Sequence, residues 1–599
     1  MRRGTDFFAA LFAIFIGAFI LGCGPAKQQS STAKADSLGV DYTVIQKRAE
    51  RFKPALGKRG GEIILSTISD PKSFNPITST ETSTSEFTAY MYEGLVKVNG
   101  VTMMPEPNLA QSWDVSADGL VWTFHMRPGV RWSDSVPVTA RDVEFTFNKL
   151  IYNENVNPNS SRDIFLIEGK KIGVTVLDSM TVRFTLPVPF APFLRTMAQE
   201  VLPRHAYEKY VNNGSFSNAL GIKTPPDSMV GAGPYILESY ISSQKVVFKR
   251  NPLYWQHDSA GTQLPYLDRI VYMVVQDQNA ELLQFKNRLI DYLEAKGEDY
   301  PGLMKDAAGI GYAVYRLGPS MGSSFLFFNQ NTGVDPRTKK AYVDPVKQSW
   351  FCDARFRKAV AWALDRESMI RIVMNGLGYP QWGPMSPTEG YFYNPNVPQY
   401  PYSMDSARAI LARAGYRDSN NDSIIEDPAG HPVTFSFVTN SGNNVRVKIA
   451  EIIRKDLERL GFKVYFNQLE FNTLIQKIDN PPYDWDAILL GLTGGPEPHF
   501  GKNVWHSTGS LHMWFPRQKK PATAWEVRID SIFDAAVKIV DDSKRKALYD
   551  EWQVIVADQL PLNYTVLAER IFCLSDRFGN INPSPNGGIL HNYERIYVK

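Results

Sequence analysis

Short runs of apolar and β-branched residues recur along the chain and are separated by turn-forming dipeptides. Residues 61–68 place three consecutive aliphatic side chains before Ser and Thr, and Asp70-Pro71 closes this run. Runs of the same kind lie at 121–124 and 182–186, each preceded by an Asp-Gly or Asp-Ser turn. This composition, bounded in this way, predicts β-strands.

Longer amphipathic segments lie between the strands. Asp353 is a suitable N-cap for a helix whose apolar residues recur at mostly three- or four-residue spacing as far as Gly376. A second segment carries Ile or Leu at 449, 453, 457 and 460 and ends at Gly461. The alternation of helices with short strands predicts a mixed α/β protein built of several lobes. With 599 residues the chain also exceeds the roughly 250–300 at which one core stops growing.

The N-terminus has a different pattern. Arg2 and Arg3 precede an uncharged apolar run of 15 residues, Phe7–Leu21, which is too short for a comfortable membrane span but suits a signal peptide. The run ends in Ile-Leu-Gly-Cys, which resembles the lipobox of a bacterial lipoprotein with Cys23 as the lipidated residue. An ordinary signal peptide with Cys23 near the cut by chance is the alternative. Polar residues without periodicity follow and predict a flexible tether to residue 58.

Charge and cysteine content narrow the class of protein. Lys and Arg total 65 against 62 Asp and Glu, with no long basic run, so we expect no nucleic-acid partner. Beyond Cys23 only Cys352 and Cys573 remain. We expect free thiols, although an exported protein can also pair two cysteines and geometry decides.

A series of motifs in fixed order resembles the bacterial extracellular solute-binding proteins of family 5, the oligopeptide- and dipeptide-binding type. One stretch reads DGLVWTF, a later one GAGPY, and others RNPLYW and LPYLD. The residues that carry the resemblance are 104–113, 118–124, 127–134, 138–143, 231–235, 250–255, 264–268, 355–360 and 363–366. Most of these motifs consist of turns, caps and core aromatics, so they define the fold rather than the ligand.

The resemblance implies an α/β fold of the periplasmic-binding-protein type, with two main lobes joined by a hinge and a smaller inserted domain (type II, three-domain variety). Its implied parts are a signal peptide at 1–22, a lipidated tether at 23–58, a discontinuous lobe I at 59–99, 230–318 and 562–599, an inserted domain II at 100–229, and a lobe III at 319–561.

The function that the resemblance implies is the substrate-binding component of an ABC importer. A peptide binds between the lobes, the hinge closes, and the complex delivers the peptide to a membrane permease and its ATPase. The protein is then a monomer without cofactor, exported and lipid-anchored on the extracytoplasmic face of a membrane. An oligosaccharide or a metal chelate is the alternative ligand, because relatives with this scaffold carry both.

An exported hydrolase is the rival class. Residues 318–322 spell G-x-S-x-G around Ser320. That motif needs a helix after the serine, whereas the following residues predict a strand, so we expect no enzyme.

Two further patterns suggest metal ions. His499, His506 and His512 lie within 14 residues, but no metal-binding spacing is present. Residues 418–427 begin like a calcium loop, yet Gly is missing at its sixth position and Ala429 stands where the closing Glu belongs. We predict no metal site, and calcium at 418–427 stays open.

The ligand contacts are expected in two loops that follow strands. One is the Ser/Thr-rich loop near Thr80, and the other is the glycine-rich segment 491–499, where another backbone can approach closely. The predicted ligand-binding residues are Thr80, Glu81, Thr82, Trp382, Asn440, Asn443, Gly491, Leu492, Thr493, Gly494, Gly495, Glu497, His499 and Trp505, with Arg446 as a weaker candidate.

One departure from the family concerns the ligand's amine. In peptide-binding relatives the second loop runs Gly-Trp and then an Asp that pairs with the peptide's α-amino group. Here Leu492 replaces the Trp, and Gly495 stands where the Asp would be. A buried ammonium needs a counter-charge. We therefore expect Glu497 or Glu81 to supply it, or a ligand that has no free amine at its buried end.

Overall fold

The computed structural model describes residues 42–599 except 79–80, 157–161 and 163. The predicted signal peptide and Cys23 lie outside the described residues. Within them, no helix has the length and apolar content that a membrane span requires. Helix α1 (Tyr42–Glu50) falls in the predicted tether, but it belongs to the folded body, where Ala49 is buried and Ile45 packs against a core. Its few apolar positions explain why the sequence pattern missed it.

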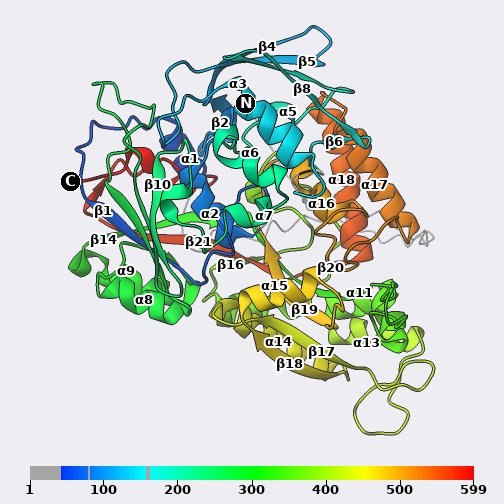
Figure 1. Ribbon diagram of the computed structural model, residues 1–599. Helices are drawn as coiled ribbons and strands as arrows, with labels where there is room; N and C mark the ends of the chain where they lie inside the picture. Colours follow the sequence, from blue (N-terminus) through cyan, green and yellow to red (C-terminus); the bar gives the residue numbers. More distant parts are fainter. Residues whose placement is uncertain (1–41, 79–80, 157–161, 163) are drawn as a thin grey trace, which may run out of the picture. The chain divides into compact units, whose positions relative to one another are not determined.

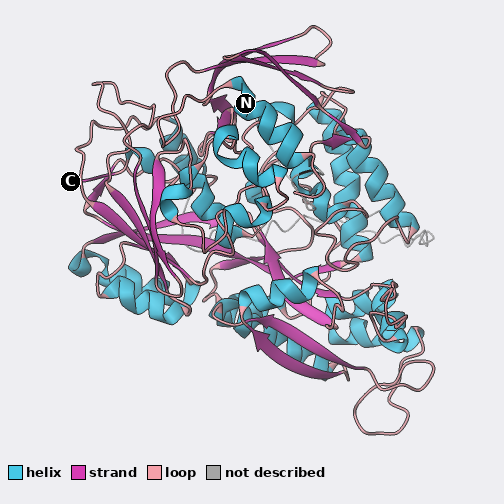
Figure 2. Ribbon diagram, in the orientation of Figure 1, coloured by secondary structure: helices cyan, strands magenta, loops and turns pink. Residues whose placement is uncertain are grey.

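Two sheets are built mainly from residues 62–319 and 566–575 (Figures 1 and 2). One has the strand order β1–β12–β11–β10, with β1 parallel to β12. The other has the order β13–β21–β14, and β16 adds to β21. Their bounds are β1 Glu62–Thr67, β10 Tyr235–Ile241, β11 Lys245–Arg250, β12 Arg269–Val274, β13 Tyr292–Ala295, β14 Tyr312–Pro319, β16 Gly378–Pro380 and β21 Val566–Ser575. The strand predicted at 61–68 is thereby confirmed.

An antiparallel sheet of order β4–β5–β9–β8 lies in the region predicted as an inserted domain. The predicted strands at 121–124 and 182–186 correspond to β5 and β9. The bounds are β4 Ala110–Val115, β5 Val121–Met126, β8 Gly173–Asp178 and β9 Thr181–Thr185. Three small pairs complete the strands: β2 Val96–Val98 with β3 Pro105–Pro107, β6 Leu166–Ile167 with β7 Lys170–Lys171, and β22 Phe578–Gly579 with β23 Tyr597–Val598.

The five-stranded sheet has the order β18–β17–β19–β15–β20. Strands β17 and β18 are parallel and are connected through helix α14 (Asn444–Arg459), which Figure 1 shows beside them. The bounds are β15 Ser323–Phe328, β17 Thr434–Asn440, β18 Lys463–Leu469, β19 Ala487–Leu492 and β20 Leu562–Tyr564. The chain therefore leaves this sheet only after Tyr564, slightly beyond the boundary predicted at 561.

Helices cover both faces of this sheet. Alternate residues of β15 point to opposite cores: Leu326 and Phe328 pack in one, and Phe325 and Phe327 in the other. A strand buried on both faces needs a continuous apolar run, which is why this one lacks polar alternation. Helix α14 packs in the first core, while α17 (Ala524–Ala536) and α18 (Asp542–Gln559) lie side by side and pack in the second (Figure 1).

Several helices begin after a residue whose side chain caps the first turn, as Asp277 and Asp541 do. The bounds are α2 Thr82–Met91, α3 Ala140–Phe145, α5 Phe193–Thr196, α6 Arg204–Asn212, α7 Phe216–Ala219, α8 Gln278–Lys286, α9 Tyr300–Ile310, α10 Pro345–Cys352, α11 Ala354–Ala363, α12 Arg366–Ser368, α13 Met404–Arg413, α14 Asn444–Arg459, α15 Phe471–Asp479, α16 Lys502–Trp505, α17 Ala524–Ala536 and α18 Asp542–Gln559. The amphipathic helix predicted up to residue 460 is confirmed as α14.

The long helix predicted from Asp353 is divided in the structure. Asp353 caps α11 as expected, accepting a hydrogen bond from the Arg355 N–H. The helix ends at Ala363, and Asp365 then caps α12 by accepting from the Ser368 N–H. Asp365 competes for the backbone in this way, so it stops one helix and starts the next.

Candidate ligand-binding cavity

A cavity of about 780 Å³ is lined by residues of the β1, β13–β21 and β15–β19 sheets together with α2, α8 and α14. This volume is in the range typical of small-molecule sites. The chain passes from one group of sheets to the other at residues 319–323 and 564–566. The two crossings bond to each other, with the Ser320 N–H donating to Ala568 O (2.8 Å) and the Thr565 N–H to Ser324 O (2.9 Å).

Six of the predicted residues line this cavity. They are Asn440, Asn443, Gly491, Leu492, Thr493 and Gly494. The close backbone approach expected at these glycines is present, but it comes from the chain itself. A Cβ at Gly491 would lie 2.6 Å from Ser323 O, and one at Gly494 would lie 2.0 Å from Met321 O. These glycines therefore allow β19 to pack against the first crossing at the cavity wall.

Arg446 adds a positive charge to the same wall. The Asn443 side chain, which caps α14, accepts a hydrogen bond from the Arg446 backbone N–H. Arg446 Nη1 donates to Asn440 Oδ1 at 2.6 Å. Burial lowers the pKa of Arg446 to about 10, so the guanidinium stays charged at neutral pH. The weaker sequence candidate is thus held by the two asparagines predicted with it.

Three predicted residues have protein partners away from this lining. Glu497 is buried and pairs with Arg545 at 2.5 Å, and its side chain also accepts from the His499 N–H. Burial lowers the pKa of His499 to about 3, and its Nε2 contacts Ile164 O at 3.1 Å. Trp505 packs in a core against other tryptophans.

Trp382 and Gly495 are also outside the described lining of the cavity. The Trp382 ring lies 4.6 Å from the Arg366 guanidinium carbon. The Gly495 N–H donates to Glu389 Oε1 at 2.7 Å. Burial raises the pKa of Glu389 to about 8, so this carboxyl holds a proton at neutral pH.

The predicted Ser/Thr-rich loop is described in part. Thr80 lies outside the described residues, and Thr82 begins α2 with a side chain outside them. Glu81 accepts a hydrogen bond from Lys72 Nζ at 2.5 Å. It lines a second cavity, of about 470 Å³, together with Asp479 and Arg517.

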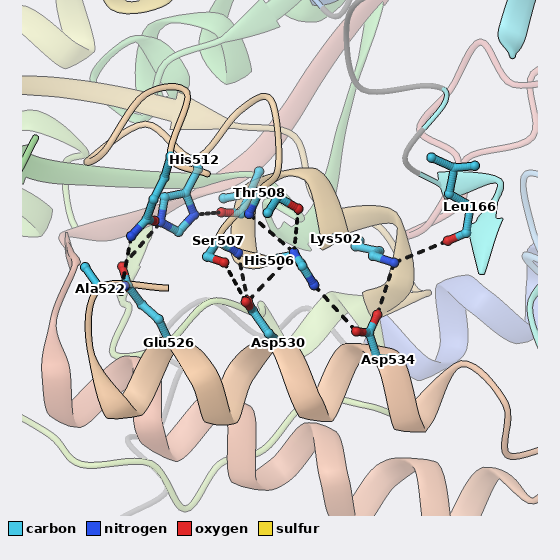
Figure 3. A network of polar contacts seen from close by, with 12 residues as sticks. Leu166, Lys502, His506, Ser507, Thr508, His512, Ala522, Glu526, Asp530 and Asp534 are labelled. Atoms are coloured by element: carbon cyan, nitrogen blue, oxygen red, sulfur yellow. Dashed lines mark hydrogen bonds and ion pairs between the residues drawn. The ribbon is translucent and has the colours of Figure 1, made fainter. Parts of the chain in front are cut away.

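His506 and His512 belong to a network of polar contacts beside α17 (Figure 3). His506 faces Asp530 and Asp534 at 3.8 and 3.6 Å, whereas His512 faces Glu526 at 3.5 Å. The two histidines therefore face different carboxylates of α17, two for His506 and one for His512. The network fastens the loop 506–512 to α17.

Residues 418–427 bring three carboxylates together, including Glu426, which the calcium-loop pattern did not single out. Ligand oxygens of Asp418, Asp422 and Glu426 lie within 4.8 Å of one another. Glu426 is buried, and its Oε2 accepts from Ser419. Calcium binding at this loop stays a prediction.

Ser320 lines the cavity in a setting that does not match a nucleophile. Its Oγ accepts from the Gly322 N–H at 3.0 Å, and strand β15 follows, as the sequence predicts. No histidine is among the described residues that line the cavity. Cys352 and Cys573 are both free thiols.

Sequence reasoning missed the acidic residues of the cavity, among them Glu86 on α2, Glu281 on α8 and Glu294 on β13. Burial raises the pKa of Glu86 and of Glu281 to about 7 and also raises that of Glu294. Each carboxylate lies on a different element, so no local motif could reveal them.

Comparison with known proteins gives consistent matches. The family model described as "Bacterial extracellular solute-binding proteins, family 5 Middle" matches residues 104–511. Oligopeptide-binding protein AppA of Bacillus subtilis is 25% identical over 586 residues, covering 95% of this chain and 96% of AppA.

Solved structures show the same fold. AppA in complex with a nonapeptide aligns with a TM-score of 0.77 and 23% identity, covering 91% of this chain and 100% of that one. The periplasmic binding protein MelB of Agrobacterium fabrum C58 in complex with stachyose aligns with a TM-score of 0.76 and 22% identity, covering 91% and 86%. The predicted periplasmic-binding-protein fold is confirmed.

Proposed function

The chain belongs to the bacterial extracellular solute-binding proteins of family 5, and on this premise we propose that it is the substrate-binding component of an ABC importer for peptides. AppA is named as an oligopeptide-binding protein, and its structure holds a nonapeptide. The partners are then a peptide, the permease and its ATPase. The protein binds its ligand without chemical change.

The cavity is the observation that carries this proposal. Its lining combines residues from both sides of the two chain crossings, such as Glu281 from one side and Arg446 from the other. A ligand that contacts both sides stabilises their closed arrangement, which is how hinge closure is driven by binding. We propose the crossings at 319–323 and 564–566 as the hinge, so the second lobe boundary lies slightly beyond the one predicted at 561.

Native mass spectrometry of the purified protein tests the ligand class, because tight binders retain their ligand. We expect a ladder of peptide masses. A mass series of hexose units would instead favour the second candidate, an oligosaccharide, for which the stachyose complex of MelB is the specific support. Calorimetry with a recovered peptide and small-angle scattering should then show saturable binding and compaction.

Turnover is the decisive test against the binding role. Incubation with a bound peptide should leave its mass unchanged. Cleavage that disappears in Ser320→Ala would make the protein a hydrolase and refute the proposal.

Export and lipid anchoring complete the proposed function. The apolar run and the lipobox-like ending at Cys23 support an extracytoplasmic position on a membrane. Wild-type protein should label with palmitate and enter the detergent phase, whereas Cys23→Ser should do neither. Mature protein that starts elsewhere without lipid would contradict this part alone.

A further inference from the structure

One wall of the cavity carries an excess of negative charge. Glu86, Glu281 and Glu294 come from α2, α8 and β13 and line the same space. They are close enough to repel one another, since Glu281 and Glu294 each contribute to raising the pKa of Glu86, after the larger effect of burial. Desolvated carboxylates that repel each other in this way favour either protonation or a nearby cation.

Their hydrogen bonds come from neutral groups. Glu86 Oε1 accepts from Thr67 Oγ1 at 3.2 Å, and Ser66 hydrogen-bonds Glu281. None of the ion pairs formed within the described residues involves any of the three carboxylates. The wall therefore faces the cavity with charge that its own ion pairs do not neutralise.

The other charged side chains of the lining each have partners. Lys296 pairs with Glu298 and Asp299, and Arg446 donates to Asn440. Arg570 donates to Pro585 O, and Glu569 pairs with Arg316. Lys296 and Arg570 lower the pKa values of Glu281 and Glu294 somewhat, but burial outweighs them.

A second observation at this wall points to a ligand. Ser83 precedes Glu86 by one helical turn on α2, so the two side chains share a face. Ser83 is only 7% exposed, lines the cavity, and its Oγ has no hydrogen-bond partner in the structure. A buried hydroxyl without a partner is costly unless a ligand supplies one.

We propose that Glu86, Glu281 and Glu294, with Ser83 beside them, form a subsite for the cationic group of the ligand, an ammonium or a guanidinium. The inference rests on the proposed function, because it names the class of peptide that the cavity selects. A basic side chain and a free N-terminal amine offer the same chemistry. The subsite replaces the acidic anchor missing at Gly495 and is distinct from Glu497 and Glu81, which are paired with Arg545 and Lys72.

Calorimetry with three tripeptides tests the subsite. The probes are Ala-Lys-Ala, Ala-norleucine-Ala, which lacks the lysine charge, and N-acetyl-Ala-Lys-Ala, which lacks the N-terminal charge. We expect at least a 10-fold loss of affinity when either the lysine charge or the N-terminal charge is removed, and the sensitive position identifies the source of the cation. Glu86→Gln/Glu281→Gln should abolish that difference by lowering the affinity for the peptides that carry the sensed charge.

A matched control and a pH series sharpen the test. Glu367→Gln removes an exposed carboxylate outside the lining and should change nothing. Binding of a cation requires ionised carboxylates, so affinity should rise with pH through the pKa of about 7. For one such group the gain from pH 5.5 to 7.5 is about 25-fold. The double variant should lose this pH dependence.

The outcomes separate the subsite from the function. Peptides that bind with no preference for charge, or a preference that survives in Glu86→Gln/Glu281→Gln, overturn the subsite and leave the function intact. If no tripeptide binds, 1,5-diaminopentane is the probe: a rise in melting temperature that is lost in the double variant supports the subsite, and no rise overturns it.

Discussion

Removing Arg545 should destabilise the protein strongly without affecting ligand binding. The Arg545 and Glu497 side chains are 4% and 6% exposed and lie 2.5 Å apart. The guanidinium also lies over the rings of Phe392 and Tyr549, at 5.0 and 5.7 Å. Arg545→Met keeps much of the volume but leaves a buried carboxylate without its partner, which costs about 3–5 kcal/mol.

A double-mutant cycle isolates the pair. Glu497→Gln alone should cost about 1–3 kcal/mol, since Arg545 keeps a contact with Asp542 at 3.0 Å. The loss of unfolding free energy in the double variant should be smaller than the sum of the two single losses by about 2 kcal/mol or more. Urea unfolding followed by tryptophan fluorescence measures this, because Trp505 and Trp552 pack in the same core as Tyr549.

An exposed pair on α17 and α18 provides the control. Arg528 and Glu551 lie 2.6 Å apart but are 45% and 42% exposed, so breaking this pair should cost at most about 1 kcal/mol. Peptide affinity should stay within twofold in all these variants. A loss below about 1 kcal/mol for Arg545→Met would refute the buried-pair reasoning, and weaker peptide binding in Glu497→Gln would restore Glu497 as the amine anchor.

Three further predictions concern other parts of the fold. Gly491→Ala should lower the melting temperature measured by calorimetry, because its Cβ would lie 2.6 Å from Ser323 O; an unchanged value would contradict the tight contact. Asp534 has a pKa lowered to about 2, since the hydrogen bond and charge of His506 and the charge of Lys502 outweigh burial. The stabilisation that ionised Asp534 provides is present above the unfolded pKa of 3.8 and is lost as pH falls toward 2. Asp534→Asn should therefore destabilise the protein at pH 6 by roughly 1 kcal/mol, after allowance for solvent screening, and should match wild type near pH 2. Equal urea midpoints at pH 6 would contradict this. If the loop 418–427 binds calcium, millimolar Ca²⁺ should raise the melting temperature of wild type and not of Asp418→Asn, whereas no shift would leave only a hydrogen-bonded turn.

Periodicity predicted the elements where a local pattern and the tertiary fold agree. The strand at 62–67 and helix α14 follow their hydrophobic spacing, and Asp353 caps its helix as its residue type suggests, whereas the cap at Asn443 was not predicted. The break after Ala363 was missed because the apolar spacing continues through it. Asp365 decides that point through one side-chain hydrogen bond, which periodicity does not register.

Only the first half of the predicted loop lines the cavity. Gly491 to Gly494 line the cavity, since they directly follow β19 at its edge. Glu497 and His499 look equally polar in sequence but are buried against Arg545 and Ile164, which are distant along the chain. A polar residue in a glycine-rich loop signals a ligand contact only if no distant side chain already satisfies it.

The position of negative charge in the cavity also depends on residues that are distant along the chain. An aspartate at position 495 would lie beside Glu389, which burial keeps protonated and which already accepts from the Gly495 N–H. The other wall instead gathers Glu86, Glu281 and their neighbour from β13, residues that look like ordinary surface glutamates in a linear sequence. Only the fold places them around one space, where desolvation and mutual repulsion raise the pKa of Glu86, and the proposed cation subsite depends on this placement. In the proposed subsite, the acidic wall takes the place of the anchor that is absent at Gly495.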